Sequence, residues 1–205
     1  MADCVAVLRV VGAASGLVAA LTGGALAGGA LAGCAAPSPP PEQADPGLSS
    51  SVPAPDDPIP PVRNPRNLVA ILPCLLLTPA QLDANRIDQP GRPKDLLGNS
   101  GCEWDDKART RQFSVFVDLG SDVLRNVYSQ RDAIPVFELT QVAGLPAIRT
   151  KDDVNGPTCY FRVATAPRQT LILRFTWLQR GSGDPCGPAR TLTEAIVGNL
   201  PPLPS

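Results

Sequence analysis

The residues of this chain that could take part in chemistry are carboxylates and cysteines, because the sequence contains no histidine. Without histidine, neither a Ser-His nor a Cys-His nucleophile can form. Two pairs of adjacent aspartates remain as acid–base candidates, Asp105 with Asp106 and Asp152 with Asp153. A general acid and its partner carboxylate must face one substrate, whereas neighbouring residues of a strand point to opposite faces. We therefore expect solvated turns at these positions rather than a catalytic pair.

Cys34 lies where an apolar segment meets a proline-rich one. No charged residue occurs from Val10 to Gly33, and small residues precede the cysteine. This is the outline of a signal peptide over residues 1–33; the alternative is a transmembrane helix, but Ala and Gly dominate the run. The sequence Leu-Ala-Gly-Cys at 31–34 resembles the bacterial lipobox, which implies a diacylglyceryl thioether on Cys34. Two acyl chains anchor a protein stably, so we expect attachment to the extracytoplasmic face of the cell membrane.

The remaining cysteines predict disulfides. Apart from Cys34 and Cys4, which lies in the predicted signal peptide, the chain contains Cys74, Cys102, Cys159 and Cys186. An even number in an exported domain is typical of a disulfide framework, and three pairings are open. We favour 74 with 102 and 159 with 186, because each closes a loop of roughly 28 residues, contributing about 3 to 4 kcal/mol in the chain-entropy model. A zinc site is the alternative, disfavoured by the absence of histidine and of a C-x-x-C pair.

The segment 151–157 has a weak likeness to part of a calcium-binding loop. Asp153, Asn155 and Gly156 follow the spacing of such a loop, but no glutamate occupies its closing position. Asn-Gly is a strong signal for a hairpin turn. We expect a turn here, and no metal or cofactor in the protein.

Two arginines and two tryptophans are candidate binding residues. Arg162 and Arg174 lie on successive predicted strands, facing away from the expected core, and could form an anion patch; solvated charges are the simpler expectation. Trp104 and Trp177 could form a platform for a sugar. Because Trp177 continues an apolar stripe and Trp104 lies beside a predicted disulfide, we expect both in the core.

Composition divides the chain after its signal peptide. Residues 34–66 are rich in proline and poor in apolar side chains, so they bury too little surface to offset their ordering entropy. We expect a disordered spacer that holds the domain off the membrane; a tail with no such role is the alternative. Residues 67–205 have the length of one domain. A formal net charge of −1 and no basic stripe argue against a nucleic-acid partner.

Within residues 67–205, alternating and helical periodicities predict an α+β domain. Strands are predicted over 103–106, 111–119, 135–142, 144–151, 158–166 and 170–178, and helices over 78–87, 121–132 and 184–200. Thr78, Ser121 and Asp184 are the expected helix N-caps, and Leu119 is expected on the buried face of its strand. Hairpin spacing between strands predicts a mostly antiparallel sheet with helices packed on it, stapled by two disulfides.

Four cysteine contexts add a family resemblance. The lipobox and spacer are followed by "PCLLLTPAQLDA", "GCEW", "TCYFRV" and "GDPCGPARTLTEAIVGNL". This order is similar to that of the actinobacterial lipoproteins grouped as domain of unknown function 3558, over about residues 68–200. The resemblance implies that the four cysteines are the family's paired cysteines and that Trp104 and Pro185 belong to its structural motifs. It implies no activity. A preference for arginine over lysine suits a GC-rich genome and agrees with an actinobacterial origin.

Three classes of function stay open. We expect a non-catalytic, membrane-anchored cell-envelope lipoprotein that binds an unknown envelope protein or a small ligand. The first alternative is a lipid or glycolipid carrier with an apolar cavity between sheet and helices. The second is a hydrolase that uses carboxylates.

The predicted lipid anchor on Cys34 can be tested by one substitution. Cys34→Ala should abolish acylation and reduce retention at the membrane, because the thioether requires that thiol. Metabolic labelling with a clickable fatty acid measures this, with Cys4→Ala as a control that keeps the label. Equal labelling of wild type and Cys34→Ala contradicts the lipoprotein hypothesis.

Overall fold

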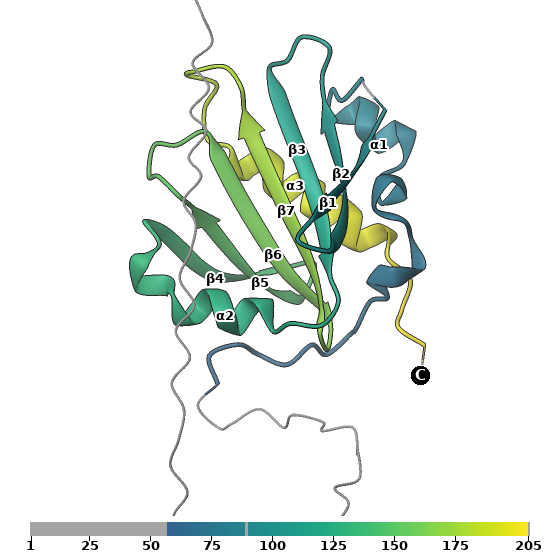
Figure 1. Cartoon of the computed structure of the whole chain (residues 1–205), viewed down its shortest axis with the longest axis vertical. Coiled ribbons are helices and arrows are strands. Elements are labelled where there is room, and N and C mark those ends of the chain that lie inside the picture. Colours follow the sequence, from purple (N-terminus) through teal and green to yellow (C-terminus); the bar gives the residue numbers. More distant parts are fainter. Residues whose placement is uncertain (1–56, 89, 205) are drawn as a thin grey trace, which may run out of the picture. The chain divides into compact units, whose positions relative to one another are not determined.

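Two adjacent strands with strict apolar alternation form the middle of the fold in the computed structural model (Figure 1). β6 (Thr158–Ala166) and β7 (Gln169–Trp177) run antiparallel, with Phe161 opposite Leu173. Successive side chains of a strand point to opposite faces. On both strands the apolar set is buried on one face, except for the partly buried Trp177, and the intervening, mostly polar set is partly buried on the other, except for the buried Thr170. The alternation predicted for these two segments is confirmed.

The structure describes residues 57–88 and 90–204. These residues belong to one compact unit, Ser50–Ser205. The predicted signal peptide, Cys34 and the first part of the predicted spacer lie outside the described residues. In the part of the chain that the structure describes, no helix has the length and apolarity needed to cross a membrane.

A single sheet of seven antiparallel strands contains this central pair, in the order β1-β2-β3-β7-β6-β5-β4. Hairpins connect β1, β2 and β3 in one group and β4 to β7 in another, and pairing of β3 with β7 joins the groups. The other strands are β1 (Arg92–Leu96), β2 (Asn99–Asp105), β3 (Arg111–Asp118), β4 (Val136–Val142) and β5 (Leu145–Lys151). The predicted α+β domain with a mostly antiparallel sheet is confirmed.

Helices cover the two faces of the sheet unequally. The helices are α1 (Pro79–Ala84), α2 (Val123–Ser129) and α3 (Cys186–Asn199), with short 3-10 helices η1 (Leu68–Ala70), η2 (Pro73–Leu75) and η3 (Arg131–Ala133). α3 lies across one face, behind β6 and β7 in Figure 1, and buries Leu192 and Ile196 in the main core. α2 lies on the other face, where Leu124 packs on Ile148 in a smaller cluster.

Two disulfides join covering segments to the sheet. Cys74 in η2 is bonded to Cys102 in β2, and Cys159 in β6 is bonded to Cys186 at the start of α3. Their Cα atoms are 5.1 and 5.2 Å apart, within the usual range for a disulfide. The favoured pairing is confirmed.

One of the three predicted helix N-caps is confirmed, and the other two are each displaced by one residue. Thr78 caps α1 as predicted, in a reciprocal capping box with Gln81. The cap of α2 is Asp122, whose carboxylate accepts from the Arg125 N–H, and the predicted cap Ser121 is wrong. Both the N–H and the hydroxyl of Ser121 donate instead to the Asp118 carboxylate, which ends β3.

The final helix begins one residue later than predicted. Pro185 occupies the N-cap position and Cys186 the first helical one. Asp184 still accepts a hydrogen bond from the Cys186 N–H, at 3.2 Å, so its carboxylate supports the helix start as expected. The predicted buried stripe is confirmed, since Leu192 and Leu200 are each 1% exposed.

Two strand predictions need correction. Leu119 is exposed rather than buried, because β3 ends one residue before it. β1 was not predicted, since all five of its residues are exposed and show no alternation. The sequence feature that could have indicated a hairpin here is Gly98, in the turn that follows β1. In that turn Leu97 and Gly98 both have positive φ, 53° and 82°. Such a pair of positive φ values suits a tight hairpin turn.

The end of the predicted spacer packs on the domain. Ile59 is buried in the smaller cluster with Leu124. Asp57 forms an ion pair with Arg125, and the Arg66 N–H donates to the Thr165 carbonyl. The domain therefore starts before the predicted boundary at residue 67, because this part of the proline-rich segment does contain apolar side chains that reach the core.

Gly91 is predicted to be a packing-critical position. A Cβ at Gly91 would lie 2.6 Å from both Cys102 Sγ and Trp104 Nε1, whereas one at Gly120 would meet no heavy atom within 4 Å. Gly91→Ala should lower the free energy of unfolding by about 1 to 3 kcal/mol through overpacking, and Gly120→Ala should change it little. Urea unfolding of both variants measures the difference; equal midpoints contradict this close contact.

Candidate functional site

One face of the sheet has polar side chains and little helical cover. We call the open face the side of β1, β2, β3, β7 and β6 that points away from α3. In Figure 1 these strands lie in front of α3, and none of the described helices lies in front of β3 and β7. Cross-strand pairing arranges the residues in the middle of this face, with two from β5, in two rows. The polar row is Thr150, Tyr160, Arg174, Ser114, Glu103 and Arg92; the mixed row is Ile148, Arg162, Ile172, Phe116, Gly101 and Lys94.

Ion pairs neutralise the acidic end of the open face. Glu103 accepts from Arg92 at 3.0 Å, lies 3.2 Å from the Lys94 ammonium and lies 3.9 Å from the Arg174 guanidinium. Arg92 also donates two hydrogen bonds to Asp105, at 2.8 and 3.0 Å. These bonds from Arg92 hold the pKa of Asp105 below its ordinary value, against the effect of burial. The carboxylates at this end are therefore fixed in ion pairs.

Arg162 lies at the other end of the open face in a different environment. Its guanidinium donates to Thr150 Oγ1 at 2.8 Å and lies 5.2 Å from the centre of the Tyr160 ring. Its side chain takes part in none of the ion pairs among the described residues. Burial lowers the pKa of Arg162 from its ordinary value. The expected solvated arginine is therefore partly buried.

The two predicted arginines share a face but not a partner. Arg174 is opposite Tyr160, and Arg162 is opposite Ile172, so the arginines are diagonal neighbours on adjacent strands. Arg174 donates to Gln112 Oε1 at 3.2 Å and reaches Glu103. Of these two arginines, only Arg162 forms no ion pair among the described residues, and the charge of Asp152 acts on it from beyond contact distance.

Tyr160 connects Arg162 to one of the predicted aspartates. Its hydroxyl donates to Asp152 Oδ2 at 2.9 Å. Burial and this hydrogen bond to Asp152 raise the pKa of Tyr160, so the phenol remains neutral at physiological pH. Asp152 is thereby engaged as an acceptor at the edge of the open face.

The first aspartate pair has structural contacts, not a shared substrate site. Asp105 lies on the open face with Arg92. Asp106 is in the turn that follows, where its carboxylate accepts hydrogen bonds from the Thr110 N–H, the Thr110 hydroxyl and the Arg111 N–H. Burial opposes ionisation of Asp106, but these hydrogen bonds outweigh it and lower its pKa. A general acid needs the opposite shift.

The second pair lies in the connection between β5 and β6. Asp153 Oδ1 accepts from the Asn155 N–H at 2.8 Å, and its carbonyl accepts from the Gly156 N–H at 3.1 Å. These are the bonds of a tight turn, as predicted. Among the described residues there is no group of three or more Cys, Asp or Glu side chains placed to hold a metal ion.

Both tryptophans serve packing. Trp104 is fully buried and stacks on Phe113, with ring centres 4.6 Å apart. Trp177 is partly buried, meets Phe175 edge-on and is covered by the Arg111 guanidinium at 5.0 Å. The Trp104 indole is therefore inaccessible to a sugar, and one face of the Trp177 indole is occupied by Arg111.

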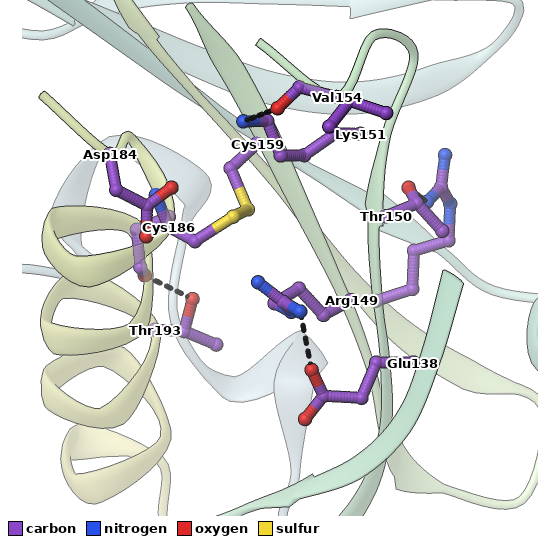
Figure 2. Close-up of a disulfide and its surroundings, with 11 residues drawn as sticks. Glu138, Arg149, Thr150, Lys151, Val154, Cys159, Asp184, Cys186 and Thr193 are labelled. Carbon is purple, nitrogen blue, oxygen red and sulfur yellow. Dashed lines mark hydrogen bonds and ion pairs between the residues drawn. A yellow bond between two sulfur atoms is a disulfide. The ribbon is translucent and has the colours of Figure 1, made fainter. Parts of the chain in front are cut away.

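The sequence did not reveal a charged cluster beside the second disulfide. Figure 2 shows Arg149 extending between Glu138 and the Cys159–Cys186 bond, with Lys151 on the other side of that bond. Arg149 pairs with Glu138 at 2.6 Å, and the Lys151 ammonium, although its residue is 7% exposed, donates to the Val154 carbonyl. The alternation of β5 could have predicted this cluster, because it places Arg149 and Lys151 on the same, α3-facing side of the strand as Leu145 and Ala147.

Comparison with protein families gives one match. The family described as Protein of unknown function (DUF3558) matches residues 29–199. The chain belongs to this family. Curated proteins and solved structures give no match. The span shared with DUF3558 includes all four disulfide cysteines, both rows of the open face and Cys34.

The ion pair of Asp105 predicts a pH dependence for this DUF3558 domain. Because its pKa is lower in the folded state than the ordinary value of 3.8, Asp105 stabilises the fold above that pH, and this contribution is lost as pH falls through the folded pKa. Asp105→Asn should therefore lose less stability than wild type between pH 7 and pH 3. Urea unfolding at both pH values measures this; identical losses contradict the assignment.

Proposed function

We propose that the protein is a non-catalytic, lipid-anchored module of an actinobacterial cell envelope, and that its open face binds a small ligand or a partner protein. Lipid on Cys34 attaches it to the extracytoplasmic side of the membrane. The proline-rich segment before residue 57 connects the anchor to the domain. No nucleic acid, metal or cofactor takes part.

The observation that carries this proposal is the uncovered polar face with a partly buried, unpaired arginine. A buried charge without a counter-ion is unfavourable, so a fold that retains one gains from a bound anion. Arg162 is held in place by Thr150 and Tyr160. A guanidinium that is already held in position on an uncovered face favours binding of an anionic group.

The contacts of the four aspartates favour binding over hydrolysis. Asp105 and Asp106 have lowered pKa values, and each is held by hydrogen bonds from its own neighbourhood. Asp152 accepts from Tyr160, and Asp153 supports a turn. Neither Asp105 nor Asp106 has the raised pKa that keeps a general acid protonated near neutral pH.

Packing beneath α3 favours binding over carriage of a lipid. Phe161 and Leu173 on the sheet and Ala189 and Ile196 on the helix are each 0% exposed and belong to one continuous cluster. Side chains therefore fill the space between helix and sheet that a carrier would keep for an acyl chain.

The family match supports the anchor, and the contacts of residues 57 and 59 indicate where the spacer would join the domain. The matched span begins at residue 29, so it includes the cysteine and the small residues before it. The first described residues are held on the domain, through Asp57 with Arg125 and through buried Ile59. The spacer would thus meet the domain at a fixed place, beside α2.

Native mass spectrometry of the full chain, extracted from its own membrane, tests this proposal. We expect a mass that corresponds to a chain starting at an acylated Cys34, with a further bound component. Arg174→Glu on the open face should reduce occupancy by that component at least about tenfold. Arg180→Glu, the same charge reversal in an exposed loop, should leave occupancy unchanged.

Two outcomes would overturn parts of this proposal. An unacylated mature chain removes the anchor. Turnover of an ester, glycoside or peptide substrate that is lost in one of Asp105→Asn, Asp106→Asn, Asp152→Asn or Asp153→Asn, with the fold intact, establishes a hydrolase.

A further inference from the structure

The charge of Arg162 is unusual for this domain. Two other partly buried arginines pair with carboxylates, Arg149 with Glu138 at 2.6 Å and Arg111 with Asp106 at 3.8 Å, whereas Arg66 donates to the Leu200 carbonyl. Arg162 is bonded to a neutral hydroxyl, Thr150 Oγ1, and stacks on a neutral phenol. Because Asp152 acts on Arg162 only from beyond ion-pair distance, the guanidinium can still take a carboxylate in direct contact from a bound group.

The cause of its partial burial is visible in the mixed row. Arg162 is opposite Ile148 on one side and Ile172 on the other. Ile148 is fully buried beneath α2, in contact with Leu124. Arg162 thus lies at the border between the covered and the open part of this face, where water is partly excluded and an ionic contact is strengthened.

The local charges favour a carboxylate as the missing partner. A guanidinium presents paired N–H donors that match a planar carboxylate, and one singly charged anion would balance Arg162. Phosphate at neutral pH carries more than one negative charge, so the Asp152 carboxylate, held by the Tyr160 hydroxyl, would repel it more strongly than a singly charged carboxylate.

An apolar strip continues from Arg162 across the open face. Ile172 is opposite Arg162, Phe116 is opposite Ile172, and both are only partly buried. Gly101 is opposite Phe116, and a Cβ there would lie 2.5 Å from the phenylalanine ring, so the ring lies over the glycine. The strip reaches about 10 Å from Arg162, two strand spacings.

We infer that the open face binds a small molecule with a carboxylate on Arg162 and an apolar tail over Ile172 and Phe116. This inference rests on the proposed binding function and names its ligand class. The polar row beside the strip, with Tyr160 and Arg174, borders the site on its other side. Neither the anchor nor the non-catalytic assignment depends on it.

Titration with hexanoate, acetate and inorganic phosphate tests this inference. The probe is the unlipidated full-length Cys34→Ala chain, followed by NMR of backbone amides and arginine Nε–H groups. Hexanoate should shift the Arg162 Nε–H signal and the amides of Ile172 and Phe116, and it should bind about tenfold or more tightly than acetate, because its extra methylenes cover the strip. Phosphate should bind more weakly than hexanoate.

Matched variants separate this site from surface binding. Arg162→Met should abolish the hexanoate shifts, while Arg180→Met, which removes an exposed loop charge, should preserve them. Ile172→Glu places a carboxylate opposite Arg162 and should also block hexanoate, which keeps the test decisive if Arg162→Met fails to fold.

Four results would overturn the inference: no saturable hexanoate binding, binding retained in the Ile172→Glu variant, shifts centred away from Arg162, or phosphate binding as tightly as hexanoate. An acylated, ligand-bound protein in native mass spectrometry together with any of these would leave the proposed function standing and reject only the ligand class. The two failures are therefore distinguishable.

Discussion

The sheet is covered by α3 on one face and by α2 on only part of the other, and this unequal cover determines where each strand must be apolar. Since side chains alternate between faces, neighbours in sequence have opposite surroundings. Phe161 and Leu173 are fully buried against the α3 side, whereas Arg162 and Arg174 point to the open face. A shift of register by one residue would exchange these sets and put guanidinium groups in the core.

Both disulfides act on the covered face. Cys186 is the first helical residue of α3, so its bond to Cys159 fixes the N-terminus of the helix to a central strand. Cys102 holds η2 on the same face, next to the buried indole of Trp104. The covalent links therefore secure the segments that complete the core. The open face is free of such links, and its side chains are constrained mainly by cross-strand contacts.

Electrostatics then distinguishes the two ends of the open face. At one end Glu103 and Asp105 are balanced by Arg92 and its neighbours. At the other end Arg162 is partly buried and forms no direct ion pair with a carboxylate among the described residues. Membership in a family of unknown function supplies no chemistry, because function resides in sites rather than folds. The absence of an ion pair at Arg162 is therefore the chemical feature of this domain that indicates a bound ligand.

Local sequence determined the features that depend on near neighbours: the Thr78 cap, the alternating strands β6 and β7 and, through loop length, the disulfide pairs. Tertiary structure alone decided which strands meet and which charges are paired. β1 has no apolar alternation, and it forms because β2 offers it a free edge. Arg174 donates a hydrogen bond to Gln112, which is 62 residues away in the sequence, and Arg162 forms no ion pair with any described carboxylate. Periodicity records which face a side chain occupies, but burial and counter-ions depend on strands brought together from distant parts of the chain.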